Sequence, residues 1–503
     1  MRPTAKSQAR NTARLRRLPA LLLAAMLASN SFAALDLPDL GDPSEQALPD
    51  YQARSIGASS VRQLEASGAF LDDPEVNAYL DQLGHRLVSS SAEITGSFAF
   101  FAIDSPEINA FALPGGYVGV NSGLILATNN ESELASVLAH EISHITQQHV
   151  ARQLQAQSGS QIAALAGLLA AVVAAGSGNG EMASAAIAGV TAGQLQSQIN
   201  FTRENEEEAD RLGFKLLIHS GFDGRGMAEL FRTLQQRNRL AESDQPSWLR
   251  SHPLTTQRIA EAEDRALSAP YRQVPDSIDF LMVRALLRSY QGEPAETLAA
   301  LQQALDANPP RARQNALRYG LAAAQLRAGN FDAALELTRA LEADRVEHPM
   351  IAALVGQIHL QARHHDEAIT HYEAALSRYP DHLQLVLDYP RALIKAGRPA
   401  EAARFAERRL STLRGNAQLH RIAAEAYAGA GRPMASHYQL GEYYALAGNQ
   451  RGALEQFELA LNMRDADEFT LARVQARLRE LRAAMKTDGK GDERQGDRRG
   501  QRG

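Results

Sequence analysis

The stretch SVLAHEISHITQQH, residues 136–149, places two histidines four positions apart, with a glutamate directly after the first histidine. Apolar residues recur around this motif at helical spacing, so we expect a helix over about residues 131–157. On a helix, positions four apart differ by ~40° in direction and ~6 Å along the axis, so His140 and His144 can bind one metal ion. Glu141 then points beside the ion, where it can accept a proton from a water molecule.

Chance is a weak explanation for this motif. Histidine accounts for 14 of the 503 residues and the two acidic residues together for 58, so a random chain would contain about 0.05 such motifs. Two histidines do not complete a site, because a catalytic zinc ion needs a third protein ligand and an open position for water. The chain contains no cysteine, so the third ligand must be a histidine, an aspartate or a glutamate.

The stretch FTRENEEEADRLG, residues 201–213, is the main source of carboxylates and opens a second expected helix over residues 204–219. Acidic residues in a first helical turn also interact favourably with the helix dipole, so several of them need no further role. Charge alone does not select a ligand among the acidic residues of this stretch, which are Glu204, Glu206, Glu207, Glu208 and Asp210.

Other histidines near the motif are weaker candidates. His149 lies five positions after His144, which is ~140° around the same helix, so we expect it at the surface or in contact with a ligand rather than as a ligand. His85 and His219 have no metal-like spacing.

The N-terminus has the features of a secretory signal. Residues 1–35 contain no acidic side chain, and a basic segment precedes an apolar run at residues 18–28 and the small-residue site Ser31-Phe32-Ala33. We expect a signal peptide over residues 1–33, cleaved after Ala33. The alternative, a membrane anchor, is disfavoured because the apolar run is shorter than the ~20 residues needed to span a bilayer.

The charge of the remaining chain argues against a nucleic-acid partner. Without residues 1–33 and their six basic side chains, 46 basic residues face 58 acidic ones, a formal charge of −12. Such a surface repels phosphate backbones. The hydrophobic share of 45% and the charged share of 22% are typical of a globular protein with sizeable cores.

Residues 162–175, IAALAGLLAAVVAA, form an unbroken apolar run that is followed by GSGNG. As a helix this run is ~21 Å long, too short for a ~30 Å hydrocarbon layer. Two interpretations stay open: a buried core helix, or a flap or membrane-touching hairpin within residues 162–192. No apolar run reaches the ~18 residues of a spanning helix, which argues against an integral membrane enzyme.

Short strands are expected between the first helix and the histidine motif. A helix over residues 74–88 has Asp73 as its N-cap, and SFAFFAID, residues 97–104, reads as a strand. The stretch INAFALPGGYVGVNSGLIL, residues 108–126, offers two short runs around Pro114-Gly115-Gly116 and predicts a hairpin or a bent edge strand.

The chain changes character past about residue 275, where helical pairs rich in alanine and leucine repeat. Equivalent small residues at Ala334, Ala368, Ala402 and Ser436 are each 34 residues apart, the period of tetratricopeptide repeats. Such repeats stack into a solenoid with a concave groove that can bind another protein.

Five segments result from these patterns. We expect a signal peptide, an extended segment, a metallopeptidase domain, a repeat domain and a disordered tail, over residues 1–33, 34–54, 55–272, 277–485 and 486–503 respectively.

Several motifs together resemble one family. The stretches NAFALPGGYVGVNSGLIL, ESELASVLAHEISH, ENEEEADRLG and SHPLTTQRI are similar to the zinc metallopeptidase family of the CAAX prenyl proteases and the heat-shock membrane protease, in its soluble, secreted branch with C-terminal tetratricopeptide repeats. The resemblance covers nearly the whole chain. It implies an α+β zincin-like domain of the gluzincin type, followed by an all-α repeat solenoid.

The resemblance also implies roles for single residues. It makes Glu206 the third ligand of one zinc ion per chain, beside His140 and His144, and makes Asp210 the acceptor that orients a ligand histidine. It suggests that residues 116–121 form an edge strand on which an extended substrate pairs.

His252 lies in a loop where this family has a His-Pro pair. We hypothesise that it approaches the zinc ion, either filling the open position at rest or helping to bind the developing oxyanion; a loop cap is the alternative. Arg203 and Arg258 are expected to pair with the acidic cluster or to form exposed salt bridges.

The function implied by the resemblance is that of a periplasmic zinc endopeptidase, with Glu141 as the general base. Its expected substrates are misfolded or stalled outer-membrane β-barrel proteins, and its repeats would contact their assembly machinery. The enzyme could also lie peripherally at the outer membrane. The rival interpretation is a periplasmic chaperone or assembly scaffold whose zinc site is occluded and mainly structural.

Overall fold

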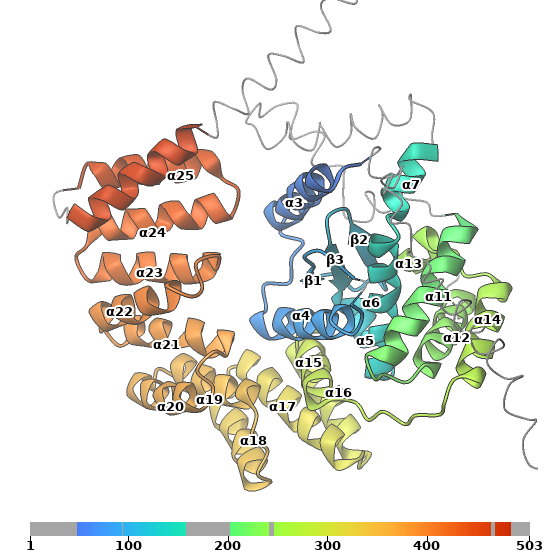
Figure 1. Cartoon of the computed structure of the whole chain (residues 1–503). Coiled ribbons are helices and arrows are strands. Elements are labelled where there is room, and N and C mark those ends of the chain that lie inside the picture. The colour runs from blue at the N-terminus through green and yellow to red at the C-terminus, as the bar shows by residue number, and fades with distance from the viewer. Residues whose placement is uncertain (1–47, 93, 157–201, 241–245, 464–467, 484–503) are drawn as a thin grey trace, which may run out of the picture.

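A computed structural model describes residues 48–92, 94–156, 202–240, 246–463 and 468–483 of the chain (Figure 1). The expected signal peptide, the apolar run at residues 162–175 with its flanks, and the expected tail lie outside the described residues. Within the described ranges, no helix combines the length and the apolar character needed to cross a membrane.

A three-stranded sheet forms the β part of the N-terminal half. The strands are β1 (Ala99–Ile103), β2 (Ala110–Leu113) and β3 (Tyr117–Asn121), in the order β1-β3-β2. β1 pairs parallel with β3 and β2 pairs antiparallel with it. The hairpin alternative for residues 108–126 is therefore confirmed.

The suggestion that residues 116–121 form an edge strand is wrong. β3 hydrogen-bonds to β1 on one side and to β2 on the other, so it is the central strand, and β2 and β1 are the edges. The tight turn at Gly115 and Gly116, where φ is +84° and +97°, folds β2 back along one side of β3 and leaves the other side for β1. A side chain at Gly116 would lie 2.1 Å from the Ser97 carbonyl oxygen, so glycine is required there.

Helix α6 (Glu131–Thr146) is the central element of this half, and every residue from 131 to 144 is buried. It contacts α4 (Pro74–Val88), the sheet, α11 (Arg203–His219) and α12 (Arg225–Leu240). The surrounding helices are α3 (Asp50–Ala66), α5 (Ser122–Ala127), α7 (His149–Ala156), α13 (Ser247–Ser251) and α14 (Thr256–Ser268). Asp73 caps α4 as predicted, because its side chain accepts the Glu75 and Val76 amide N–H groups.

The prediction of one helix over residues 131–157 is wrong at its centre. α6 ends at Thr146, and α7 starts afresh at His149. Gln148 between them has φ +50°, a left-handed conformation that an uninterrupted α-helix does not contain. The apolar pattern continues across this break, so periodicity alone did not reveal it.

The C-terminal half is a stack of helices in successive pairs (Figure 1). The first helices of the five complete pairs are α15 (Ile278–Ser289), α17 (Arg311–Arg327), α19 (Pro349–Gln361), α21 (Leu383–Lys395) and α23 (Ala417–Gly429). Their partners are α16 (Pro294–Asp306), α18 (Phe331–Ala343), α20 (His365–Arg378), α22 (Pro399–Leu410) and α24 (Pro433–Leu446). α25 (Gln450–Leu461) then packs with a helix over residues 468–483. The repeat positions Ala334, Ala368 and Ala402 are fully buried, as the 34-residue period requires.

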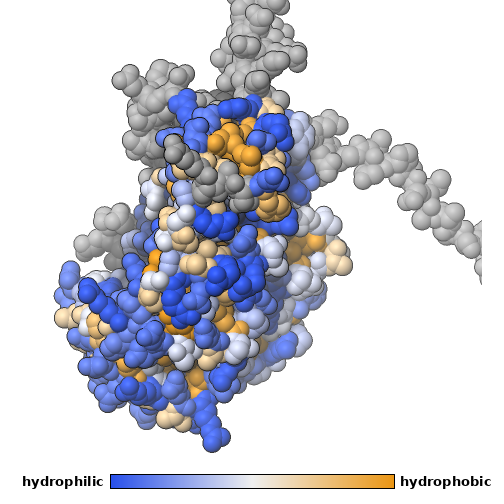
Figure 2. All heavy atoms as spheres, turned by 90° about the vertical axis from the view of Figure 1, so that its left-hand side faces the viewer, coloured by the Kyte–Doolittle hydropathy of each residue, from blue (hydrophilic) through white to orange (hydrophobic). Residues whose placement is uncertain are grey.

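The stack joins the N-terminal half through a shared core. One hydrophobic cluster runs from Val76 and Leu80 on α4 through Phe280 on α15 to Leu354 on α19. Further along the stack, His382 Nε2 lies 3.1 Å from Glu75 Oε2 of α4, and α21 contacts the same helix. The face of the molecule on the repeat side is mostly hydrophilic, with hydrophobic residues in small groups (Figure 2).

The crossing of α11 over α6 depends on Gly213. A Cβ atom at this position would lie 3.1 Å from both the amide nitrogen and the Cα atom of His140. The helix backbones therefore approach each other at the histidine motif itself.

We expect Gly213→Val to lower the free energy of unfolding by about 1–3 kcal/mol, because the new side chain must push α11 off α6. Urea denaturation measures this change. Gly415→Val is the control, since a Cβ atom at Gly415 meets nothing within 4 Å. Equal losses for the two variants would contradict the proposed contact.

Candidate metal centre

Four buried side chains bring ligand atoms together where α6, α11 and α13 meet. His140 and His144 lie on α6, and Glu206 lies in the first turns of α11. His252 is the C-cap residue of α13. One ligand atom of each lies within 4.8 Å of all the others, and none of the four side chains is more than 2% exposed.

The spacing of these atoms suits a four-coordinate ion. A tetrahedral ion with bonds of 2.0–2.1 Å has ligand atoms about 3.3–3.4 Å apart. The Nε2 atom of His140 lies 3.0 Å from His144 Nε2, 3.3 Å from His252 Nδ1 and 3.5 Å from Glu206 Oε2. Glu206 Oε1 lies 3.4 Å from His144 Nε2 and 2.9 Å from His252 Nδ1. Imidazole and carboxylate donors at these distances fit a divalent metal ion.

A buried carboxylate and a guanidinium support His140 from behind. Asp210 Oδ1 lies 3.0 Å from His140 Nδ1, so it can accept the ring N–H and direct Nε2 into the cluster. Arg258 donates to both oxygens of Asp210 at 2.7 and 2.8 Å, and its Nη1 atom lies 2.7 Å from Glu206 Oε2. Arg258 is fully buried, so the pairing with the acidic cluster holds and the exposed alternative does not.

Burial and the neighbouring charges shift the pKa values of the residues in this centre in opposite directions. Burial acts to lower the pKa of His140, but its hydrogen bonds to Asp210 and Glu206 outweigh burial and raise that pKa to about 9. Burial and the charge on His140 hold the pKa of His144 well below its usual value. For Asp210, burial acts to raise the pKa, but the Arg258 charge outweighs it and lowers the pKa.

Glu141 lies beside the cluster and is held at one oxygen only. The indole N–H of Trp248 donates to Glu141 Oε1 at 3.0 Å, and His252 Nε2 lies 3.5 Å from the same oxygen. The other oxygen, Oε2, is buried and has no hydrogen-bond partner among the described residues. A buried carboxylate oxygen without a partner is costly, so it marks a place for a donor such as water.

His149 is not at the surface. It is fully buried, its Nδ1 atom lies 2.8 Å from His144 Nδ1, and its Nε2 atom lies 3.2 Å from Glu208 Oε2. The break at Gln148 turns α7 so that His149 lies against His144, which confirms the expected contact with a ligand and excludes the surface alternative. Burial lowers the pKa of His149 to about 4, so the ring is neutral.

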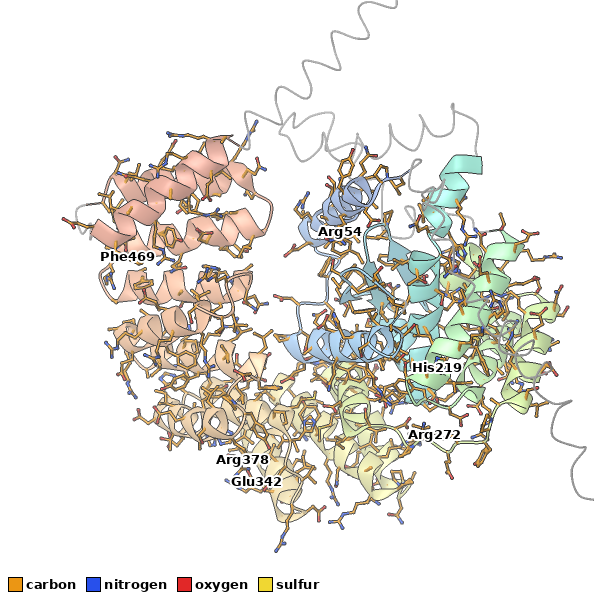
Figure 3. The ribbon with its side chains drawn as sticks, viewed as in Figure 1. Arg54, His219, Arg272, Glu342, Arg378 and Phe469 are labelled. Atoms are coloured by element: carbon orange, nitrogen blue, oxygen red, sulfur yellow. The ribbon has the colours of Figure 1, made fainter. Side chains whose placement is uncertain are left out.

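The other histidines and charged residues that the sequence analysis named do not belong to the cluster. His219, labelled in Figure 3, lies in the last turn of α11 outside the cluster, and His85 is exposed and pairs with Asp81. Arg203 and Glu204 are exposed in the first turn of α11. Sequence reasoning did not single out Trp248, and it named Glu208 only as one of five candidate ligands. The only tryptophan of the chain, four positions before His252, was the one available signal for Trp248.

A cavity of about 230 Å³ opens beside His144. It is lined by the start of α3, including Arg54, by the turn between β2 and β3, and by the connection from α6 to α7. Figure 3 shows Arg54 on α3, at the sheet side of the protein. Of the four cluster residues, His144 is the one that lines this cavity.

We expect Glu206→Gln to weaken zinc binding by more than ~100-fold, because it removes a charged ligand from the cluster. This loss of affinity exceeds the loss of about 10–100-fold that is typical when a residue that only supports a ligand is changed. Competition with a chromophoric chelator measures the affinity. Glu204→Gln, two positions away and exposed, should bind like the unchanged protein. Equal zinc affinities for Glu206→Gln, Glu204→Gln and the unchanged protein would show that Glu206 is not a ligand.

Comparisons with known proteins agree with this geometry. The model of "Peptidase family M48" matches residues 74–266, and a tetratricopeptide repeat model matches residues 290–358 and 359–430. A putative β-barrel assembly-enhancing protease of Vibrio cholerae is 33% identical over 89% of this chain and 92% of its own length.

Two proteins of Escherichia coli extend the comparison. The β-barrel assembly-enhancing protease is 33% identical over 89% of this chain and 91% of its own length. The metalloprotease LoiP is 26% identical over 43% of this chain and 82% of its own length. Likeness over almost the full length, with both family models and a buried histidine–glutamate cluster, shows that the chain belongs to the metallopeptidases of family M48, in the group of the β-barrel assembly-enhancing proteases with tetratricopeptide repeats.

Proposed function

We propose that the chain is a periplasmic endopeptidase that uses one zinc ion, held by His140, His144 and Glu206. The observation that carries the proposal is Glu141, which lies beside these ligands with one buried oxygen available to a water molecule. In this proposal Asp210 orients His140, and His252 regulates the fourth position of the ion. Residues 55–272 form the peptidase part and residues 277–485 the repeat part.

The ion, when bound, supplies a Lewis acid that polarises a peptide carbonyl and makes a water molecule more acidic. Glu141 Oε2 accepts a proton from the attacking water and later returns it to the leaving amine. Trp248 holds Glu141 through the other oxygen, so the carboxylate keeps its orientation during both transfers. Full burial of Glu141 limits competing solvent and strengthens these interactions.

The substrate enters along the cavity beside His144. β2 is the edge strand nearest to α6, so we assign to it the strand pairing that the sequence suggested for residues 116–121. The names of the relatives in Vibrio cholerae and Escherichia coli support a role in β-barrel assembly. The proposed substrates are therefore misfolded or stalled outer-membrane β-barrel proteins, and the repeats bind these proteins or their assembly machinery.

A second function is favoured by the position of His252. With this ring in the cluster, an ion would have four protein ligands available, and a closed set of four is typical of structural zinc sites. A chaperone or scaffold with an occluded ion would use such an arrangement. Glu141 distinguishes the two functions, because a structural site has no need of a base.

We expect Glu141→Gln to lower peptide cleavage by about 10²–10⁴-fold, because an amide cannot accept the proton. The assay incubates zinc-loaded protein with an unfolded outer-membrane protein and follows fragments by electrophoresis. Zinc content and binding of the unfolded protein should stay unchanged in this variant. Equal activity of Glu141→Gln and the unchanged protein, or no zinc-dependent fragment from either, would favour the scaffold.

We expect His252→Ala to change the cleavage rate about 10-fold or more and to alter its pH profile. A faster rate means that the ring blocks the open position at rest, and a slower rate means that it stabilises the oxyanion. His219→Ala is the control, since His219 lies outside the cluster. An unchanged rate and pH profile in His252→Ala would remove both roles.

A further inference from the structure

The connection between α6 and α7 is built around two interactions that Arg152 makes. Its Nε atom donates to the carbonyl oxygen of Gln147 at 2.8 Å, and its Nη2 atom donates to Glu208 Oε2 at 2.8 Å. The left-handed Gln148 lies inside this loop and turns the start of α7 back toward α6. A non-glycine residue in this conformation is held by its surroundings at a small cost.

This turn places His149 between His144, a histidine of the cluster, and the carboxylate of Glu208, which also binds Arg152. Nδ1 of His149 faces Nδ1 of His144 at 2.8 Å, and Nε2 of His149 faces Glu208 Oε2 at 3.2 Å. The four side chains form one continuous line, from His144 through His149 and Glu208 to Arg152. Sequence reasoning gave no role to Arg152 and named Glu208 only among the candidate ligands.

The Glu208 end of this line determines which ring nitrogen of each histidine carries a proton. Glu208 can only accept, so His149 must carry its proton on Nε2 and donate it. The two Nδ1 atoms face each other at 2.8 Å, so one of them must accept; His149 uses its Nε2 proton on Glu208, and its Nδ1 atom is the acceptor for the Nδ1–H of His144. His144 is thereby left with a lone pair on Nε2, the atom that faces the cluster. The opposite direction would put a proton on His144 Nε2 and set a lone pair of His149 against the Glu208 carboxylate.

We propose that His149, held by Glu208 and Arg152, is a positioning residue that fixes the ring orientation of His144 and the tautomer able to bind the metal ion. This inference rests on the proposed metal site. It gives His144 the kind of support that Asp210 and Arg258 give His140, with an imidazole inserted between ligand and carboxylate. Contacts of this kind raise metal affinity without touching the ion.

Three variants of His149 and Glu208 test the role. We expect His149→Phe, which keeps a ring but has no acceptor, to weaken zinc binding by about 10–100-fold. His149→Asn can place an amide oxygen near the position of Nδ1, so we expect it to recover most of the affinity. Glu208→Ala should weaken binding less than His149→Phe but more than the neighbouring control Glu207→Ala, which should match the unchanged protein.

The measurements are zinc affinity by chelator competition and the exchange of the His144 Nδ1 proton by nitrogen-15 NMR of the zinc-loaded full chain. The line predicts a slowly exchanging Nδ1 proton that is lost in His149→Phe and regained in His149→Asn. Thermal unfolding of the metal-free variants checks the fold. Because Glu208 lies partly at the surface, Glu208→Ala tests the line even if His149→Phe unfolds.

The outcomes separate this inference from the proposed function. Failure of the unchanged protein to bind zinc would remove the metal site and the inference with it. Zinc binding by the unchanged protein, with equal affinity in His149→Phe and Glu208→Ala, would overturn the inference alone. An asparagine variant as weak as the phenylalanine variant would also overturn it, because lost packing would then explain both.

Discussion

The close crossing of α11 over α6 is the constraint on which the centre depends. Gly213 lets the two backbones meet at His140, and the acidic first turns of α11 then lie against the histidine motif. α6 is buried along nearly its whole length, so its histidines and Glu141 are removed from water. Burying these carboxylates requires compensation, which Arg258 supplies to Asp210 and Glu206.

Each cluster histidine on α6 is backed by a line of close polar contacts that ends in arginine. His140 is followed by Asp210 and Arg258, and His144 by His149, Glu208 and Arg152. The indole N–H of Trp248 holds one oxygen of Glu141 by a hydrogen bond. The side chains that would touch the ion and the water are thus oriented by the fold before either binds, which limits the reorganisation needed during reaction.

The repeats are joined to the peptidase half as part of its packing. α4 shares a hydrophobic cluster with α15 and α19, and Glu75 on α4 pairs with His382 before α21. The first repeats therefore support the helix that packs on α6. α4 occupies part of the surface that an isolated repeat array would offer, so a partner that binds the repeats contacts a unit already attached to the peptidase half.

The sequence alone determined what short periodic patterns encode. It placed His140, Glu141 and His144 on a helix, Asp73 at a helix cap, a hairpin at residues 108–126 and helical repeats every 34 residues, because such features depend on neighbours a few positions apart. The resemblance, rather than charge, pointed to Glu206 among five acidic residues. Tertiary structure decided that β3 is central, that α6 breaks at Gln148 and that His149, Glu208 and Trp248 meet the cluster. These contacts depend on how segments distant in sequence cross and turn, which local patterns do not specify.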